Sequence, residues 1–308
     1  MAATAHEPAI ASAPAEDEQS PWRRFAAEFF ESRLALLGLA MLVVVIVVAV
    51  AAPFISPQNP YDLAQLDVMD SKLAPGDRSA GSGKAYWLGT DDQGRDMLSG
   101  IFYGLRTSLT VGVASTLLAL AIGLVLGLAA AYFGGWTDAV IMRVADIQLS
   151  FPAILIALIL LAVLGQGVDK IIAALVTVQW AYYARTVRSS ALVERQKEYV
   201  EAAKVLALSQ PRIVFRHLLP NCLPPLIVVA TVQVAHAISL EATLSFLGLG
   251  LPITEPSLGL LISNGFQYLL SGKYWISFYP GLALLLTIVA INLVADQLRD
   301  VLNPRLKR

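Results

Sequence analysis

The chain alternates between long apolar runs and polar segments, and the apolar runs predict membrane-spanning helices. A helix needs about 20 mostly apolar residues to cross the hydrocarbon core of a bilayer. The fourth run is the shortest and leads directly into Arg185 and Arg188, so its helix either ends there or continues into the cytosol. We therefore expect an all-α membrane protein with six transmembrane helices, over residues 34–54, 109–133, 147–164, 171–183, 223–247 and 278–294.

Lysine and arginine orient these six spans, because they gather in cytosolic loops. With the N-terminus in the cytosol, 15 of the 22 Lys and Arg residues lie inside and 7 lie outside. Four or five spans would put the basic clusters on opposite sides. The pattern therefore predicts that both termini are cytosolic, that segments 55–108 and 248–277 are periplasmic, and that segment 185–222 is cytosolic.

The first 21 residues are rich in Ala, Glu and Pro and lack the apolar core of a signal peptide. They are expected to form a disordered cytosolic tail, followed by one transmembrane domain over residues 22–308.

Composition supports a membrane protein and excludes several classes of partner. The chain is 56% hydrophobic and 15% charged, whereas soluble domains average about 25% charged residues. A net charge of -1 gives no reason to expect nucleic acid. The single cysteine, Cys222, excludes an internal disulfide framework. His6, His217 and His236 are far apart in the sequence, so no local metal site is expected.

The inner segment is too polar to span and too patterned for a passive linker. Residues 209–211, Ser-Gln-Pro, break one helix and can start another, because proline suits a first helical turn; the second helix is expected to end at Pro220. Ala202 and Ala203 would leave a flat surface for close approach by another protein, and Glu201 would add a fixed charge. The alternative is an amphipathic helix lying on lipid headgroups.

Other polar and small residues are candidates for outer, packing or intramembrane roles. Gly89 and Gly94 suit turns. Gly123 and Gly127 form either a close-packing pair or part of the general glycine enrichment of membrane helices. Arg143 and Asp146 could pair, three residues apart on one helix face. Acidic and basic side chains in the outer segment could form a charge network that fixes the loop or contacts a partner: Asp91, Asp92, Arg95 and Asp96.

Glu241 lies near the outer end of the fifth span. Acids within spans are costly and face protein or water, so it is either a pathway residue or a buried hydrogen-bonding group. His236, five residues earlier, is expected to be a packed polar residue rather than a ligand.

Glu201-Ala202-Ala203, followed sixteen residues after Ala203 by Leu219-Pro220, resembles the EAA loop of binding-protein-dependent ABC importer permeases. The resemblance implies a type I ABC importer permease fold. It also implies that this loop forms the coupling helix, which docks in a groove of the ATPase subunit. The family has glycine six residues after its glutamate, whereas this chain has Ala207, which leaves the geometry of the turn open.

Two further motifs resemble the dipeptide, oligopeptide and nickel branch, in its second, dipeptide-permease-C-like subunit. They are residues 88–109, which include Gly89, Thr90, Asp91, Gly94, Arg95 and Asp96, and residues 241–250. This chain departs from the branch at Gly100, where arginine is usual, and at Leu258, where tryptophan is usual. The resemblance covers about residues 22–308.

The resemblance implies a bacterial inner-membrane permease that forms half of a translocation pathway. Its partners would be a homologous second permease subunit, two cytosolic ABC ATPase subunits and a periplasmic or lipid-anchored solute-binding protein. Peptides are the commonest cargo of this branch; nickel, glutathione, opines and oligosaccharides stay open.

No cofactor or metal is expected on this chain, and ATP and Mg²⁺ would bind the ATPase subunits. A phosphate loop needs G-x-x-x-x-G-K-[ST], but Ala85 follows Gly83-Lys84 and Arg78 replaces the first glycine. The chain is therefore expected to have no ATPase site of its own.

Two other classes of function compete with an importer subunit. A self-sufficient secondary transporter commonly shows inverted repeats and midplane charges, but no clear repeat is visible and Glu241 lies near one face. A membrane enzyme would need a catalytic motif such as H-E-x-x-H or G-x-S-x-G, and neither surrounds a candidate residue here.

Overall fold

The computed structural model describes residues 21–302, and within that range it forms helices, turns and two isolated β-bridges but no strand. The all-α prediction is confirmed. The predicted disordered tail lies outside the described residues except for Pro21, at which the first helix begins. The α-helices are α1 (Pro21–Glu31), α2 (Arg33–Ile55), α3 (Met97–Phe133), α4 (Gly135–Leu149), α5 (Ala153–Leu164), α6 (Val168–Arg195), α7 (Glu198–Val205), α8 (Gln210–Ile213), α9 (Leu219–Phe246), α10 (Leu258–Phe266) and α11 (Trp275–Leu302).

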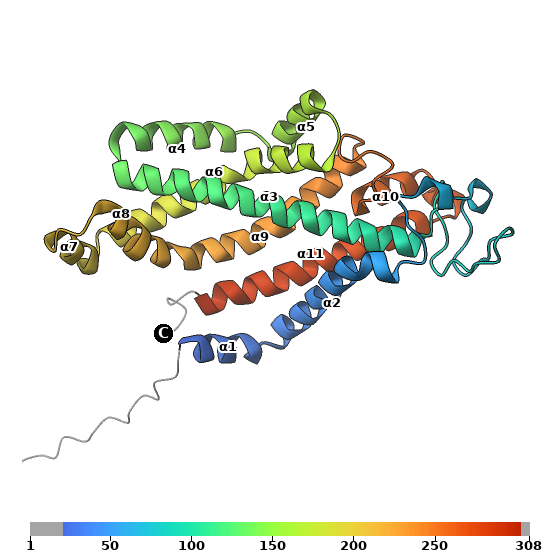
Figure 1. Cartoon of the computed structure of the whole chain (residues 1–308), viewed down its shortest axis with the longest axis horizontal. Helices are drawn as coiled ribbons and strands as arrows, with labels where there is room; N and C mark the ends of the chain where they lie inside the picture. Colours follow the sequence, from blue (N-terminus) through green and yellow to red (C-terminus); the bar gives the residue numbers. More distant parts are fainter. Residues whose placement is uncertain (1–20, 303–308) are drawn as a thin grey trace, which may run out of the picture.

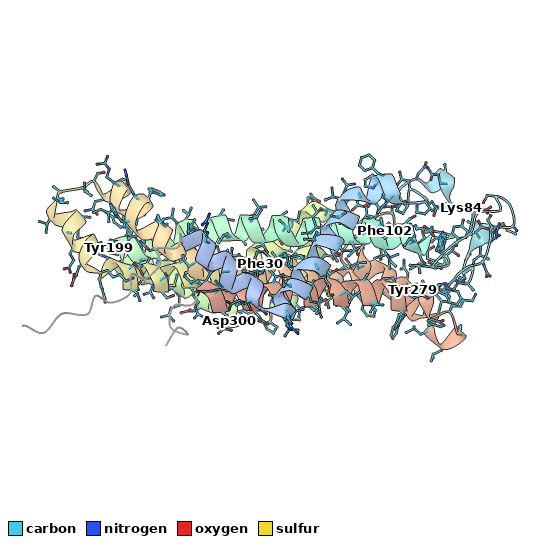
Figure 2. All side chains as sticks on the ribbon, turned by 90° about the horizontal axis from the view of Figure 1, so that it is seen from below. Phe30, Lys84, Phe102, Tyr199, Tyr279 and Asp300 are labelled. Carbon is cyan, nitrogen blue, oxygen red and sulfur yellow. The ribbon has the colours of Figure 1, made fainter. Side chains whose placement is uncertain are left out.

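The long helices lie lengthwise in one elongated bundle (Figure 1). α2, α3, α6, α9 and α11 run roughly along the long axis, with α7 and α8 at one end and α10 at the other. Tyr199 of α7 and Lys84 of the segment between α2 and α3 lie near opposite ends (Figure 2). The inner and outer segments expected from the sequence are therefore at opposite ends of the molecule.

Among residues 21–302, four stretches are long and apolar enough to cross a membrane: α2, α3, residues 210–246 and α11. The third predicted span is not one continuous helix, because α4 and α5 meet at a bend of 91°. Pro152 stands at this break, where its missing N–H and fixed φ suit the start of a new helix. Counted as one crossing, this bent pair gives a fifth candidate.

The fourth predicted span, 171–183, is the apolar half of a much longer helix. α6 has 28 residues, a length of about 42 Å, and its second half is rich in polar side chains.

The fifth predicted span also starts earlier than expected. The helical structure does not end at Pro220, because α8, a π-helical turn over Val214–Leu218 and α9 follow one another without a gap.

Close contact between α3 and α6 rests on glycine. A Cβ at Gly127 would lie 2.6 Å from the Ala184 carbonyl oxygen and 2.7 Å from the Val187 Cβ. A Cβ at Gly123 would meet Tyr183 and the Trp180 carbonyl. Since real Cβ atoms do not approach this closely, these two glycines form the close-packing pair that the sequence allowed.

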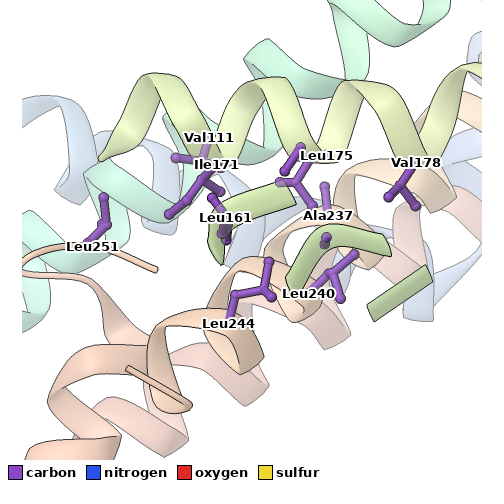
Figure 3. Packing of buried hydrophobic residues seen from close by; sticks show 11 residues of the cluster. Val111, Leu161, Ile171, Leu175, Val178, Ala237, Leu240, Leu244 and Leu251 are labelled. Atoms are coloured by element: carbon purple, nitrogen blue, oxygen red, sulfur yellow. The ribbon is translucent and has the colours of Figure 1, made fainter. Parts of the chain in front are cut away.

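The main apolar cluster joins α3, α5, α6 and α9 (Figure 3). Its buried members include Val111 of α3, Leu161 of α5, Leu175 of α6 and Leu244 of α9. Many large apolar side chains elsewhere face outward, such as Val50, which is 68% exposed, and Val125, which is 66% exposed. A surface of this kind is suited to lipid and to neighbouring membrane helices.

Candidate functional site

The outer segment before α3 contains a tight turn built on two glycines. Gly89 has φ +77° and Gly94 has φ +78°, a region that disfavours side chains. A Cβ at Gly89 would lie 2.5 Å from the Leu73 carbonyl oxygen, and one at Gly94 would meet the Asp67 carbonyl. The turn residues predicted from the sequence are therefore also close-contact residues.

Thr90 ties this turn to both neighbouring parts of the outer segment. Its hydroxyl donates to the Asp70 carbonyl at 2.5 Å and accepts from the Leu73 N–H at 2.8 Å. The Trp275 indole N–H donates to the Thr90 carbonyl at 3.2 Å. These bonds attach the turn to the start of α11.

Asp91 and Arg95 are both buried in this turn. One Asp91 carboxylate oxygen accepts the backbone N–H groups of Gln93 and Arg95, each at 2.8 Å. Burial raises the pKa of Asp91 to about 6, although these two N–H donors and the Arg95 charge act in the opposite direction. The Arg95 guanidinium donates to the Gln93 side chain at 2.6 Å and to the Ile253 carbonyl at 2.7 Å. Arg95 thus connects the two outer segments.

Asp96 is the N-cap of α3. Its carboxylate accepts from the Ser99 N–H at 2.9 Å and from the Ser99 hydroxyl at 2.5 Å, which satisfies donors that the first helical turn leaves free. Asp91, Arg95 and Asp96 therefore fix the loop over the helices through turn, carbonyl and cap bonds.

The inner segment folds as a helical hairpin of α7 and α8. Val200 and Ala203 of α7 pack against Ile213 and Leu218 across the turn. Glu201 and Ala202 are exposed on the opposite side of α7. The predicted flat surface is therefore formed by Glu201 and Ala202 but not by Ala203, which is only 4% exposed. A small residue is needed at Ala203 for packing of the hairpin.

Ala207 adopts a left-handed backbone conformation with φ +52°. This is the position at which the resembled motif has glycine, and here alanine adopts a positive φ, which glycine adopts more readily. The conformation costs an alanine roughly 1–2 kcal/mol. After the turn, Leu219 begins α9 and Pro220 lies in its first turn, where a missing N–H is tolerated.

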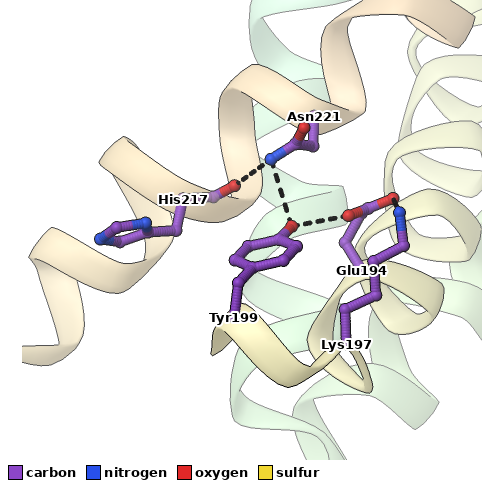
Figure 4. Close-up of polar contacts among 5 residues, drawn as sticks. All are labelled: Glu194, Lys197, Tyr199, His217 and Asn221. Atoms are coloured by element: carbon purple, nitrogen blue, oxygen red, sulfur yellow. Dashed lines mark hydrogen bonds and ion pairs between the residues drawn. The ribbon is translucent and has the colours of Figure 1, made fainter. Parts of the chain in front are cut away.

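A polar cluster that the sequence did not reveal fastens this hairpin to the bundle (Figure 4). Glu194, near the end of α6, accepts from Lys197 at 2.6 Å and from the Tyr199 hydroxyl at 2.6 Å. Asn221 of α9 donates to the Tyr199 hydroxyl at 3.1 Å and to the His217 carbonyl at 2.7 Å. We call Glu194, Lys197, Tyr199 and Asn221 the hairpin latch.

The charge state of the latch follows from these contacts. Burial acts to raise the pKa of Glu194, but the hydrogen bonds from Lys197 and Tyr199 outweigh it and lower the pKa. Burial and the bond to Glu194 raise the pKa of Tyr199 to about 12. Glu194 is therefore an anion at neutral pH and Tyr199 a neutral donor. Only the three-residue spacing of Glu194 and Lys197 could have signalled part of this cluster in the sequence.

Glu241 is fully buried and joins α9 to α3. Its carboxylate accepts from the Ser108 hydroxyl of α3 and from the Ser245 hydroxyl, each at 2.8 Å. These contacts favour the structural role over a pathway role. His236 does not share this setting: it is exposed on the surface of α9, so the expectation of a packed residue is wrong within this chain.

Ion pairs also link α4 to α6. Arg188 pairs with Asp138, and Arg185 pairs with Asp146 at 2.5 Å. The expected pair between Arg143 and Asp146 is thus replaced by a contact between helices. Within residues 21–302, no group of three His, Cys, Asp or Glu side chains is arranged to hold a metal ion.

Known proteins resemble this chain over nearly its whole length. It is 37% identical to the dipeptide transport system permease protein DppC of Alkalihalophilus pseudofirmus, over 96% of this chain and 95% of that protein. It is 35% identical to the di/tripeptide transport system permease protein DppC of Pseudomonas aeruginosa, over 97% and 98%. It is 33% identical to the glutathione transport system permease protein GsiD of Pectobacterium atrosepticum, over 94% and 93%.

The fold also has a solved counterpart. An inward-facing structure of the MetNI methionine ABC transporter matches with a TM-score of 0.54 and 21% identity, over 67% of this chain and 98% of that chain. Two family profiles match the sequence: the N-terminal TM domain of oligopeptide transport permease C at residues 20–75, and the binding-protein-dependent transport system inner membrane component at residues 123–308. The chain therefore belongs to the family of binding-protein-dependent transport system inner membrane components, the permease subunits of ABC importers.

Proposed function

We propose that this chain forms half of the translocation pathway of an ATP-driven importer for dipeptides and oligopeptides. Relatives named for dipeptide and di/tripeptide transport, similar over almost the whole chain, support this substrate class. A relative named for glutathione transport, itself a short peptide, is consistent with it. The family also sets aside the alternative of a self-sufficient secondary transporter.

The observation that carries the mechanism is the hairpin at the end of the bundle. α7 presents Glu201 and Ala202 outward, next to Val205 and Leu206, which are 86% and 73% exposed. Apolar side chains so exposed beside a fixed charge are suited to a protein groove. Because the latch fastens α7 to α6 and α9, movement of a protein bound at this surface would be passed to both helices.

The proposed arrangement has six crossings in a bacterial inner membrane, formed by α2, α3, the bent α4–α5 pair, α6, α9 and α11. In Figure 1, α1 and the C-terminal end of α11 lie at the same end of the bundle as α7 and α8. The basic bias of the sequence makes this end cytosolic. The segment between α2 and α3 and the segment around α10 would then face the periplasm.

The remaining parts of the importer are other polypeptides. We infer a homologous second permease, two cytosolic ABC ATPases, and a solute-binding protein on the periplasmic side. The ATPases bind ATP and Mg²⁺, and one of them docks at the α7 surface. This chain would perform no covalent chemistry and would have no cofactor of its own. Its part is alternating access, a shift between inward-facing and outward-facing populations driven by ATP and the loaded binding protein.

The test is reconstitution of the complete complex with Glu201→Lys or Ala202→Trp in liposomes. Each change should reduce ATPase retention and peptide uptake. Glu201→Lys would break one side of a charge pair that docking buries, which costs roughly 2–5 kcal/mol, and Ala202→Trp would block close approach by bulk alone. Glu31→Lys, an exposed charge reversal at the end of α1, is the matched control and should act like wild type. Full retention and uptake in both α7 variants would show that α7 is not the coupling helix.

A further inference from the structure

A cavity of about 850 Å³ opens between α6, α9 and α11, in the half of the bundle nearest the hairpin. This volume is typical of small-molecule sites. Polar side chains from all three helices line it among apolar ones: Tyr182 and Glu194 of α6, Asn221 and Gln233 of α9, and Asp296 and Arg299 of α11. Such convergence on one cavity contrasts with the apolar surfaces of α2 and α3.

Gln233 shows that the cavity calls for a polar occupant. Its side chain is only 8% exposed, and its amide nitrogen has no hydrogen-bond partner. A buried donor without an acceptor costs about 1–3 kcal/mol. An occupant with a carbonyl or carboxylate oxygen would remove that cost, whereas a lipid chain or an apolar helix face would not.

The dimensions suit a short extended peptide. Asn221 and Gln233 are twelve residues apart on α9, and so are Tyr182 and Glu194 on α6, which gives a wall length of about 18 Å in both helices. An extended chain covers about 3.3–3.6 Å per residue, so about five residues fit. Asp296 and Arg299 are exposed and provide both signs of charge for a terminal ammonium or carboxylate.

We propose that this cavity is a cytosolic exit site for short peptides, in which the Gln233 amide donates to a peptide carbonyl and Asp296 or Arg299 pairs with the charged end that lies beside α11. The peptide class rests on the proposed function. Glu194 and Asn221 belong both to the cavity wall and to the latch. Movement of α7 therefore changes the wall of the site.

Two neighbouring serines of α6 provide a matched test. Ser190 lines this cavity, whereas Ser189 lines a separate one between α4 and α6. Ser190→Cys and Ser189→Cys are each made in a Cys222→Ala background, and the complete nucleotide-free complex in lipid nanodiscs is labelled with a hydrophilic maleimide. Pentaalanine with free ends is the probe, and N-acetyl pentaalanine amide is its uncharged counterpart.

Pentaalanine at ten times its Kd should slow labelling of the cysteine at 190 by about tenfold and leave the cysteine at 189 unchanged. Gln233→Leu should weaken protection by both peptides. Either Arg299→Gln or Asp296→Asn should weaken protection, according to whether the carboxylate or the ammonium end lies beside α11, and only by the peptide with free ends. Val228→Cys, which lines this cavity and not the one between α4 and α6, replaces Ser190→Cys if that variant does not assemble.

Equal protection at 189 and 190, or none at 190 and 228, would overturn the proposal. A cysteine at 190 that is blocked with or without peptide would mean that lipid or the companion permease fills the cavity, and would overturn it too. ATP-driven peptide uptake by the same complexes separates this from the proposed function: uptake without protection contradicts only the exit site, whereas no uptake of any peptide contradicts the importer.

Discussion

The Tyr199 hydroxyl donates a hydrogen bond to the Glu194 carboxylate at 2.6 Å and so ties the first turn of α7 to the last turn of α6. Glu194 is largely buried, and Lys197 is its other partner. The carboxylate therefore depends on Tyr199 for one of its two side-chain contacts. Because this hydrogen bond holds α7 to α6, a force on α7 would move α6 and would not only bend the hairpin.

Tyr199→Phe should weaken coupling with little effect on assembly. Hydrogen bonds to charged groups contribute roughly 1.5–3 kcal/mol, and partial exposure of Tyr199 reduces this to about 1 kcal/mol. This is about fivefold in the equilibrium between the latched and the open hairpin, and the ratio of peptide taken up to ATP hydrolysed should fall. Tyr274→Phe, at the start of α11, is the control, since the contacts of Tyr274 are with aromatic rings. Unchanged coupling in Tyr199→Phe would remove the latch from the mechanism.

Asp91 predicts a pH dependence of stability. Its folded-state pKa is about 6 against an ordinary 3.8, so between these values the folded chain binds more protons than the unfolded chain. Stability should therefore increase as pH falls from 7 toward 5, by on the order of 1–3 kcal/mol from this group. Asp91→Asn should remove that part of the dependence, because its amide oxygen can still accept the Gln93 and Arg95 N–H groups.

The measurement is the Tm of the complex from pH 4.5 to 7.5, compared between wild type and Asp91→Asn. Asp77→Asn is the control, since Asp77 is exposed in the same outer segment and should keep the wild-type profile. If Asp91→Asn shows the same dependence of Tm on pH as wild type, then Asp91 is charged throughout this range and the prediction is wrong.

The sequence predicts the helices well where apolarity alone decides them. α2 matches the predicted run within one residue at each end, and α11 contains its predicted run but begins earlier and ends later. The sequence does not settle where α6 ends, because tertiary contacts support a helix through its polar half: Arg185 and Arg188 find partners on α4, and Glu194 finds Tyr199. The hydropathy of α6 alone does not predict those partners.

The candidate site is likewise predictable only where local chemistry suffices. Gly89 and Gly94 are turn residues on composition alone, whereas the N-cap role of Asp96 emerges only in the structure. The burial of Ala203 depends on Ile213 and Leu218, which approach only after the chain turns at Ala207. The cavity between α6, α9 and α11 depends on three segments that are distant in sequence.

The proposed topology predicts opposite accessibility for the two ends of the bundle. Ser82 and Gln196 are both exposed, Ser82 in the segment between α2 and α3 and Gln196 just before α7. Single cysteines at these positions, in a Cys222→Ala background, are treated with an impermeant maleimide on intact spheroplasts. The cysteine at 82 should be labelled and that at 196 only after lysis. The reverse pattern would invert the topology.

Close packing at Gly127 predicts an asymmetry between two glycines within helices. Gly127→Ala should destabilise by about 1–3 kcal/mol, because the new methyl group would overlap the Ala184 carbonyl and Val187, and neither backbone can move freely. Gly281→Ala, in α11, meets nothing within 4 Å and should be neutral or stabilising by up to about 1 kcal/mol. Assembled yield and Tm of the complex measure both. If Gly127→Ala and Gly281→Ala are equally stable, then α3 and α6 are not held in close contact at Gly127.

The turn of the hairpin provides the last prediction, because its left-handed residue is an alanine. Ala207→Gly should stabilise the hairpin, since φ +52° is strained for alanine and not for glycine. The gain is about 1 kcal/mol, less than the full strain because glycine also adds entropy to the unfolded chain. Ala202→Gly is the matched control: Ala202 is exposed inside α7, where glycine costs about 0.5–1 kcal/mol.

Amide hydrogen exchange over residues 198–213 of the complete complex separates the two variants. Ala207→Gly should slow exchange in α7, and Ala202→Gly should accelerate it. The same change at Ala207 should preserve or improve ATPase retention, because a better-ordered hairpin loses less entropy when a partner binds it. Faster exchange in Ala207→Gly would mean that alanine is not strained at this turn, and that the hairpin is ordered by its partner rather than by its own backbone.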